Sequence, residues 1–396
     1  MAKRNSRTKR SIRRKALAGA GRDPASLPAL SSLSELPEFG DLRPSEEQRT
    51  AYGRYCEEVQ GRDGDSTQLA LGCVVRLDRG FPAVLTEKSV FRAEFAARLT
   101  KGDFSRVAVG DWVCVRSPQG HDMGLIECIL PRTSDIARWK GGSRGERQTL
   151  AANVDVVLVV QALEEWRISS GRIVRSAVVA RDCGAHVAVV LTKAAQASAD
   201  LVRDSVGYVR EVLGEGCAVV AVDSLEGDGD CEALAQAAVQ AGGAWGVECV
   251  RELVPAGKVG IMLGPSGVGK STLLNALLGR ESLETGAVRE SDGVGRHTTV
   301  ARRMVAIPGA GVIVDEPGLR TLQLVGHERG LAMVFPAIAD AARHCKFRDC
   351  THTHEPGCEV RARFGTDQDA RRLEAYLSLA SEMRASKATL DPDIVL

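Results

Sequence analysis

A glycine-rich segment in the second half of the chain constrains the fold more than any other feature. Residues Gly264 to Ser271 read GPSGVGKS, which fits the spacing GxxxxGK[ST]. The apolar segment Val259–Leu263 before it predicts a strand, and Thr272–Leu278 after it predicts a helix. In this setting the backbone N–H groups of the loop turn inward and bind phosphate oxygens at the helix N-terminus. The sequence therefore predicts a nucleotide-binding α/β domain.

Two side chains of this loop carry the expected phosphate chemistry. Lys270 is expected to neutralise the charge of the β- and γ-phosphates, and Ser271 to ligate Mg²⁺. A glycine-rich turn without a ligand is the alternative, which the flanking strand and helix disfavour. The predicted binding residues here are Gly264, Pro265, Ser266, Gly267, Val268, Gly269, Lys270, Ser271 and Thr272.

A second motif, Asp315-Glu316-Pro317-Gly318, ends the apolar strand Val312–Val314. Alone, DxPG is more often a simple turn. After a phosphate loop, Asp315 is instead expected to hold Mg²⁺ through water, and Gly318 to offer its N–H to a γ-phosphate.

The polar segment Gly293 to Thr299 lies between these two motifs and reads GVGRHTT. The hydroxyl of Thr298 or Thr299 would complete the Mg²⁺ shell only when a γ-phosphate is present. This is the order–disorder switch of GTPases. An ordinary surface loop is the alternative.

Apolar strand candidates alternate with helical stretches around the phosphate loop, which favours a doubly wound domain with a mostly parallel sheet. Three strands, Val154–Gln161, Val187–Thr192 and Ala218–Val222, precede that loop. The last two end in Thr192-Lys193-Ala194-Ala195 and in Asp223-Ser224. Guanine-reading loops follow the phosphate loop in an ordinary G domain, so the order here would be a circular permutation. Such a rearrangement moves the termini and leaves the sheet contacts unchanged.

Four metal-binding side chains lie close together near the C-terminus, with the spacing C-x4-C-x-H-x5-C. Three thiolates and one imidazole form a closed tetrahedral site suited to structural Zn²⁺. We expect a reducing cytosol, in which clustered cysteines are more often metal ligands than disulfides. Reactive or buried cysteines are the alternative. His344 and His354 are nearby competitors, and His354 could replace His352. The predicted ligands are Cys345, Cys350, His352 and Cys358.

Short, partly alternating segments between residues 67 and 130 predict about five strands, which suits a small barrel such as the OB fold. Before it we expect one short helix around Glu46–Val59 and a basic tail, because eight of the first fifteen residues are Lys or Arg. Basic side chains here are expected to contact RNA phosphates, with solvated surface charge as the alternative. They are Arg76, Arg79, Lys88, Arg92, Arg98, Lys101 and Arg106 in the barrel, and Arg132, Arg138, Lys140, Arg144 and Arg147 after it.

Taken together, the motifs resemble the ribosome small-subunit-dependent GTPases, the RsgA (YjeQ) family, over roughly residues 67–385. The resemblance rests on Gly110-Asp111-Trp112-Val113, Asn153-Val154-Asp155, Gly264–Thr272, Gly295–Thr299, Asp315–Gly318 and the Cys/His cluster. It implies an N-terminal OB-type barrel, a circularly permuted P-loop GTPase domain and a zinc-binding helical C-terminal domain. The expected boundaries are 1–66 for a basic extension, 67–130 for the barrel, 131–150 for a linker, 151–326 for the GTPase domain and 327–396 for the zinc-binding domain.

The resemblance also implies an activity and partners. Family members are GTP phosphohydrolases that act late in the maturation of the small ribosomal subunit, slowly alone and faster on that subunit. We therefore expect GTP with Mg²⁺, one structural Zn²⁺, and contact with the small subunit and its rRNA. We expect a cytoplasmic monomer without a membrane segment, since the longest apolar run, near Val154 to Leu163, is too short to span a bilayer.

One departure concerns the base. The family reads guanine with [NT]KxD, and Thr192 and Lys193 match, but Ala195 stands where Asp is expected. That Asp accepts two N–H bonds, and hydrogen bonds to a charged group contribute about 1.5–3 kcal/mol each. The neighbouring polar residues Gln196 and Asp223 are candidates to compensate, and Asp223-Ser224 itself departs from the usual Ser-Ala. GTP remains the expected nucleotide. The alternative is a P-loop triphosphatase of relaxed base specificity, either an ATPase or a nucleotide-gated RNA-binding protein.

The residue after DxxG is Leu319, where many GTPases use Gln to position water, so slow intrinsic hydrolysis is expected. His297 is the candidate for orienting water, with a solvent-exposed histidine as the alternative. The predicted catalytic residues are Lys270, His297, Thr298 and Gly318. Beyond the phosphate loop, the predicted nucleotide-binding residues are Thr192, Lys193, Asp223, Ser224, Thr298, Thr299 and Asp315.

Overall fold

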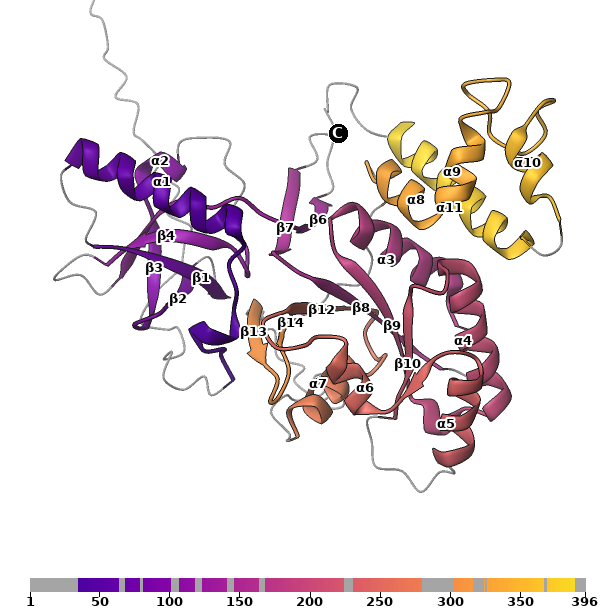
Figure 1. The fold of residues 1–396 in the computed structure, drawn as a ribbon, viewed down its shortest axis with the longest axis horizontal. Coiled ribbons are helices and arrows are strands. Elements are labelled where there is room, and N and C mark those ends of the chain that lie inside the picture. Colours follow the sequence, from indigo (N-terminus) through magenta and orange to yellow (C-terminus); the bar gives the residue numbers. More distant parts are fainter. Residues whose placement is uncertain are drawn as a thin grey trace, which may run out of the picture.

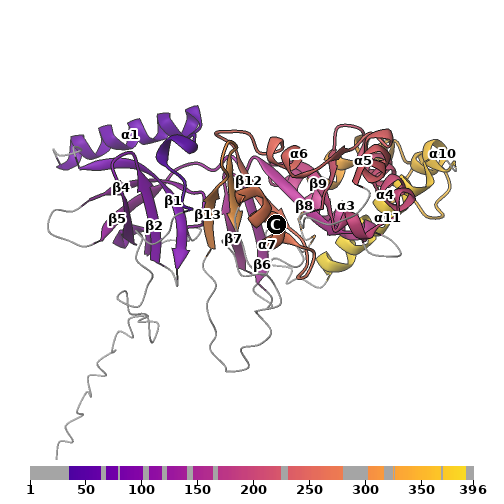
Figure 2. The same cartoon turned by 90° about the horizontal axis from the view of Figure 1, so that it is seen from below.

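The computed structural model describes residues 35–63, 68–78, 81–100, 107–117, 123–140, 146–163, 168–223, 231–279, 302–315, 324, 326–366 and 369–388. Figure 1 shows three parts in a row: a barrel, a central sheet flanked by helices, and a group of C-terminal helices. After a 90° turn the barrel and the C-terminal helices still lie at opposite ends of the central sheet (Figure 2).

The barrel consists of five strands in the order β1-β2-β3-β5-β4, and β1 also pairs with β4, which closes it. Buried side chains such as Val74, Val84 and Ile126 fill its interior. The predicted five-stranded barrel is thereby confirmed. Its elements are β1 (Leu69–Asp78), β2 (Phe81–Thr86), β3 (Val90–Phe95), α2 (Ala97–Thr100), β4 (Trp112–Arg116) and β5 (Gly124–Ile129).

The helix before the barrel, α1 (Glu46–Asp63), packs against β4. Ser45 and Gln48 cap its start reciprocally, because the Gln48 N–H donates to Ser45 Oγ and the Ser45 N–H donates to Gln48 Oε1. The hydroxyl of Tyr52 donates to the carbonyl of Leu69 at 3.2 Å, which ties the helix to β1. The expected helix is present and continues beyond Val59.

The segment expected to be a polar connection contains a hairpin of β6 (Asp135–Lys140) and β7 (Glu146–Ala152). Ile136, Leu150 and Ala151 are fully buried at its base. The buried apolar residues of the hairpin are neighbours in the sequence and lie among many polar ones, so they do not form the alternation from which a strand is recognised. This explains why the sequence does not predict the hairpin.

The central sheet has the order β11-β10-β9-β8-β12-β14-β13. Neighbouring strands are parallel except for β13, which runs antiparallel to β14. The strands on one side of β12 come before it in the chain and those on the other side come after it, as the permuted order requires. The strands are β8 (Val156–Ala162), β9 (His186–Thr192), β10 (Ala218–Ala221), β11 (Ala244–Trp245), β12 (Val259–Leu263), β13 (Arg302–Ala306) and β14 (Val312–Asp315).

Helices cover both faces of this sheet. In β8, Val157 and Val159 share a buried cluster with residues of α3 and α4, whereas Leu158 and Val160 share another with residues of α6 and α7. From β8 the chain adds strands toward one edge of the sheet, and from β12 it adds them toward the other. The crevice at the carboxyl ends of β8 and β12 is therefore the expected ligand site of such a sheet. These helical elements are α3 (Ser170–Asp182), η4 (Ala194–Gln196), α4 (Ala199–Leu213), α5 (Cys231–Gln240), α6 (Val247–Glu252) and α7 (Lys270–Leu278); the turn η3 (Phe39–Asp41) precedes α1.

The barrel and the central sheet share one continuous twelve-stranded sheet, because β1 pairs antiparallel with β13. Arg76 lies opposite Arg303 in this pairing, and Leu77 lies opposite Arg302. The strand of the central sheet that joins it to the barrel is therefore β13, which follows the predicted switch segment in the sequence.

The C-terminal helices pack on the central part through α3, as Figure 1 shows. A Cβ on Gly330 would lie 2.1 Å from the carbonyl oxygen of Val178, so only glycine permits this approach of α8 to α3. Asp182 accepts hydrogen bonds from the Gly330 N–H and contacts the His327 ring at 2.7 Å. The helices are α8 (Glu328–Val334), α9 (Pro336–Ala342), α10 (Glu359–Phe364) and α11 (Ala370–Ala388).

None of the helices among the described residues is both long and apolar enough to cross a membrane.

Candidate functional site

The glycine-rich loop lies between β12 and α7, in the strand–loop–helix context that its spacing predicts. Gly267 and Gly269 have φ angles of +84° and +90°, a backbone conformation that is strained for residues other than glycine. A Cβ on Gly264 would lie 2.5 Å from the carbonyl oxygen of Val160, so this position also requires glycine. The loop therefore has the backbone of a phosphate cradle at a helix N-terminus.

Lys270 is the first residue of α7, and its ammonium folds back over the loop. Its Nζ atom donates to the carbonyl oxygens of Gly264 at 2.7 Å and of Pro265 at 2.8 Å. The positive charge thus lies beside the glycine-rich backbone, where the phosphates of a nucleotide would be neutralised.

Thr192 joins the loop after β9 to the phosphate loop. Its hydroxyl donates to the carbonyl oxygen of Val268 at 2.6 Å, and the side chain is buried. The structure therefore brings together two predicted segments that are far apart in the sequence. Lys193 follows with φ of +58° and is the N-cap residue of the turn η4.

Asp223 follows β10, the next strand of the sheet. The Val222 N–H donates to the Leu191 carbonyl at 2.8 Å, and the Ala194 N–H donates to the Val222 carbonyl at 3.3 Å. These bonds hold the loops after β9 and β10 side by side. Asp223 is half-buried there.

Asp315 ends β14, the strand beside β12, and its neighbour Val314 lies opposite Ile261. The predicted magnesium-binding carboxylate and the phosphate loop thus end adjacent parallel strands at the same edge of the sheet. Arg303 lies opposite Asp315 on β13, with 3.9 Å between its Nε and Asp315 Oδ2. The sequence did not single out Arg303, because nothing local distinguishes it from other arginines.

Several predicted site residues lie outside the described part of the chain. They are Ser224, His297, Thr298, Thr299, Gly318 and Leu319.

The predicted cysteine and histidine ligands lie together between α9 and α10, with ligand atoms all within 4.8 Å of one another. Cys345 Sγ and Cys358 Sγ are 3.9 Å apart, and each lies 3.5 Å from His352 Nδ1. A tetrahedral zinc with ordinary bond lengths separates two thiolates by about 3.8 Å and a thiolate from an imidazole nitrogen by about 3.6 Å. The side chains therefore fit Zn²⁺.

The backbone around this cluster supports the same arrangement. His352 has φ of +62°, and the Arg361 N–H donates to Cys358 Sγ at 3.5 Å. Burial lowers the pKa of His352, which favours the neutral imidazole that a metal ligand requires. The competing residue His354 is exposed and contacts Thr353 Oγ1 instead.

Comparison with known proteins agrees with this geometry. The model of the RsgA GTPase family matches residues 129–325. The protein of Streptomyces avermitilis named small ribosomal subunit biogenesis GTPase RsgA is 38% identical over 367 residues, covering 91% of this chain and 92% of that protein. The chain belongs to the RsgA GTPase family. A protein of the same name from Leptospira interrogans is 33% identical and covers 86% of this chain and 88% of its own length.

Two solved structures share the fold of this RsgA-family chain. YjeQ from Thermotoga maritima has a TM-score of 0.56 at 23% identity and covers 80% of this chain and 99% of its own. YloQ, described as a circularly permuted GTPase, has a TM-score of 0.55 at 19% identity, covering 81% of this chain and 96% of its own. The permuted fold is thereby confirmed, and the family favours GTP hydrolysis over the relaxed-specificity alternative.

Some basic residues expected to contact RNA in this family member are used inside the fold. Arg132 forms two 2.7 Å hydrogen bonds with Asp111, which is fully buried. Arg76 is also buried and pairs with Asp78 at 2.7 Å. The RNA prediction is wrong for Arg132 and Arg76, because their guanidinium groups already neutralise buried carboxylates.

Asn153 has a structural role at the centre of the molecule. Its Oδ1 accepts from Gln48 Nε2 and from the Thr133 N–H, each at 2.9 Å, and its Nδ2 donates to the Gly110 carbonyl. One side chain thus joins α1, the connector and the barrel just before β8. The motif around Asn153 in the family resemblance therefore marks a junction between the parts.

Proposed function

We propose that this chain acts on the small ribosomal subunit during its late maturation and couples GTP hydrolysis to its own release. The relatives named above are small ribosomal subunit biogenesis GTPases. The observation that best supports the nucleotide part is the convergence of Thr192, the phosphate loop and Asp315 at one edge of the sheet.

The proposed binding site assigns a task to each segment. Lys270 and the backbone N–H groups from Pro265 to Ser271 bind the phosphates. Ser271 and Asp315 hold Mg²⁺, which when bound neutralises the charge on the β- and γ-phosphates. The loops after β9 and β10 bind the base, and Thr192 fixes their distance from the phosphates through Val268.

Hydrolysis is proposed to be slow on the free protein. The side chain of Leu319 lacks a polar atom to orient water, so His297 in the switch segment is assigned this step once the subunit fixes that segment. The hydroxyl of Thr298 or Thr299 is assigned to the Mg²⁺ shell. Replacing His297 with Ala should remove subunit-stimulated hydrolysis without changing GTP affinity. Unchanged stimulation would exclude His297 from the reaction.

The cysteine and histidine cluster is proposed to hold one structural zinc ion. Four protein ligands leave no open position, so the metal stabilises the segment between α9 and α10 and takes no part in hydrolysis. The barrel, a fold that commonly binds oligonucleotides, is proposed to contact rRNA of the subunit. The site of action is then the cytoplasm, where ribosomes mature.

Hydrolysis of GTP, ATP and XTP, measured with and without purified small subunits, tests this proposal. We expect GTP to be preferred and the subunits to accelerate its hydrolysis. The Lys270→Ala variant should abolish the acceleration and serves as the control for contaminating enzymes. Equal rates with all three nucleotides, or no response to subunits, would contradict the proposal.

A further inference from the structure

The base-reading loop after β9 lacks an acceptor at one position. Ala195 has only a methyl group where a carboxylate would accept the N1–H and N2–H donors of guanine. A guanine edge left without that acceptor loses two charge-assisted hydrogen bonds, each worth about tenfold or more in affinity. A guanine-specific site in this chain therefore needs a carboxylate from elsewhere.

The neighbouring loop supplies a carboxylate at the right place in the sheet. β9 and β10 are parallel, with Ala221 opposite Leu191, and Figure 1 shows them side by side. The pairing continues beyond the strands, since the Ala194 N–H donates to the Val222 carbonyl at 3.3 Å. Asp223 is the next residue, so its backbone lies beside Ala194 and Ala195.

The alternative compensating residue is placed less well. Gln196 is exposed, whereas Asp223 is half-buried. Gln196 is also an amide, which presents a donor as well as an acceptor, whereas a carboxylate presents two acceptors to the two guanine donors. Thr192, only three residues before Ala195, is fixed to the phosphate loop through Val268, so both base loops lie at the nucleotide end of the sheet.

We propose that Asp223 is the residue that selects guanine in this protein, with its carboxylate replacing the one missing at Ala195. The inference rests on the proposed GTPase function and names the residue that determines its base specificity. The carboxylate that accepts from guanine thus comes from the loop after β10 instead of the loop after β9, and it binds the same N1–H and N2–H donors.

Base chemistry makes the proposal testable. Guanine presents N–H donors at N1 and at the exocyclic N2, whereas xanthine has a carbonyl oxygen at position 2. A carboxylate at position 223 accepts hydrogen bonds from the two N–H donors of guanine and repels the carbonyl oxygen of xanthine. An amide there donates to the xanthine oxygen while accepting from N1–H. Asp223→Asn should therefore reverse the preference between GTP and XTP, which simple loss of a structural residue would not do.

Equilibrium binding of GTP, XTP and ATP to the full-length protein and its variants provides the experiment. Asp223→Ala should weaken GTP binding about a hundredfold or more, because both hydrogen bonds are lost, and Asp223→Asn should bind XTP more tightly than GTP. The double variant Ala195→Asp with Asp223→Ala should recover GTP binding, because it returns the carboxylate to the loop after β9. XTP binding by the Asn variant also shows that it is folded.

Asp200→Asn is the matched control, because Asp200 is an exposed carboxylate of α4 paired with Arg203. It should leave the preference between GTP and XTP unchanged. If Asp223→Asn keeps the wild-type preference for GTP, the assignment of Asp223 is wrong while the GTPase function stands. A wild-type protein that binds no nucleotide, or binds all three equally, would overturn both.

Discussion

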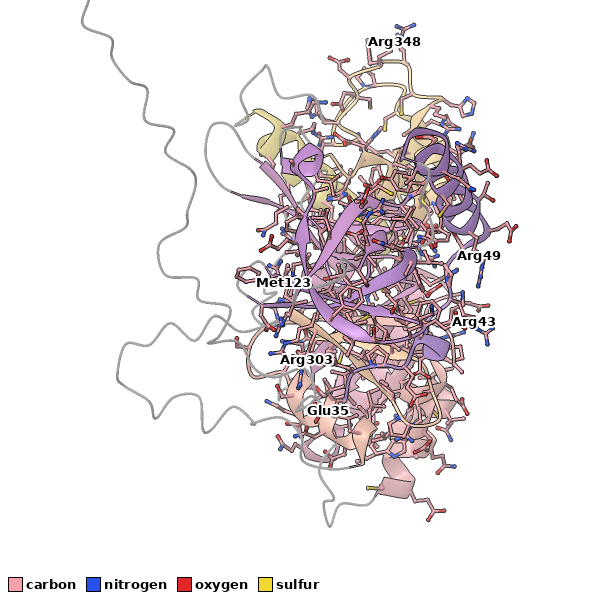
Figure 3. All side chains as sticks on the ribbon, turned by 90° about the vertical axis from the view of Figure 1, so that its left-hand side faces the viewer. Glu35, Arg43, Arg49, Met123, Arg303 and Arg348 are labelled. Carbon is pink, nitrogen blue, oxygen red and sulfur yellow. The ribbon has the colours of Figure 1, made fainter. Side chains whose placement is uncertain are left out.

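The guanidinium of Arg303 donates a hydrogen bond to the Glu35 carboxylate across 2.9 Å, although 268 residues separate them in the chain. Figure 3 shows the two labelled residues next to each other on one side of the molecule. The Ala306 N–H also donates to the Glu35 carbonyl at 2.9 Å, so the segment before α1 is attached to β13 by backbone and side chain. Arg303 Nε in turn lies 3.9 Å from Asp315 Oδ2, at the proposed magnesium site.

Replacing Glu35 with Gln should weaken the binding of Mg²⁺ with nucleotide. The substitution keeps the shape of the side chain and removes the charge that balances Arg303, so the arginine acts more strongly on Asp315. A change of about 1 kcal/mol, or about fivefold in affinity, is expected for a pair that remains partly accessible. The measurement is GTP hydrolysis as a function of Mg²⁺ concentration.

A second ion pair provides the control for that experiment. Arg175 and Glu382 join α3 to α11, with side chains 24% and 36% exposed. Helix α3 packs against β8 and β9, which β12 and β14 separate from β13 in the sheet. Glu382→Gln should leave the Mg²⁺ requirement unchanged. An equal shift in both variants would show that Glu35 acts only through general stability.

The nucleotide loop and the metal cluster could be predicted from the sequence because their geometry is local. Eight consecutive residues from Gly264 to Ser271 define one turn, and the positive φ angles of Gly267 and Gly269 account for two of its fixed positions. The metal ligands likewise fall within the short segment from Cys345 to Cys358. Spacing alone predicts such a site because residues this close in the sequence must also lie close together in the fold.

Pairing between distant residues could not be predicted in the same way. Arg132 resembles the other arginines of its segment in the sequence, and only the fold places it against Asp111, 21 residues earlier. The attachment of Glu35 to Arg303 and the pairing of β1 with β13 depend on how the barrel meets the central sheet. The sequence alone therefore predicts RNA contacts for some basic side chains that the fold pairs with carboxylates.

Replacing Thr192 with Val should weaken both stability and nucleotide binding. Valine preserves the shape but removes the hydroxyl that donates to the Val268 carbonyl at 2.6 Å in a buried position. An unsatisfied buried acceptor costs about 1–3 kcal/mol. Denaturant unfolding and the KM for GTP measure the two effects. Thr192→Ser retains the hydroxyl and should behave much more like the wild type; equal defects in Val and Ser variants would contradict this role.

Metal analysis of the purified protein should find about one zinc ion per chain. Cys358→Ser should lose the zinc and lower the melting temperature, because three remaining ligands no longer close the site. GTP binding should persist, since the cluster lies among the C-terminal helices, away from the phosphate loop. Cys231→Ser is the matched control, because that cysteine is exposed and outside the cluster. Full zinc content in the Cys358→Ser variant would count against the site.

Replacing Arg132 with Met should destabilise the protein by about 3–5 kcal/mol, because it leaves the buried Asp111 carboxylate without its partner. Burial raises the pKa of Asp111 despite the opposing effect of Arg132, so losing the arginine raises that pKa further. Between the pKa of Asp111 in the unfolded state and its raised pKa in the native state, the native state holds a proton that the unfolded state has released. The variant therefore loses stability as the pH rises through this range. The deficit relative to wild type should therefore shrink as the pH falls below the raised pKa of Asp111. Denaturant unfolding across pH measures this, with the exposed Arg203→Met as the control, and a deficit independent of pH would argue against an uncompensated carboxylate.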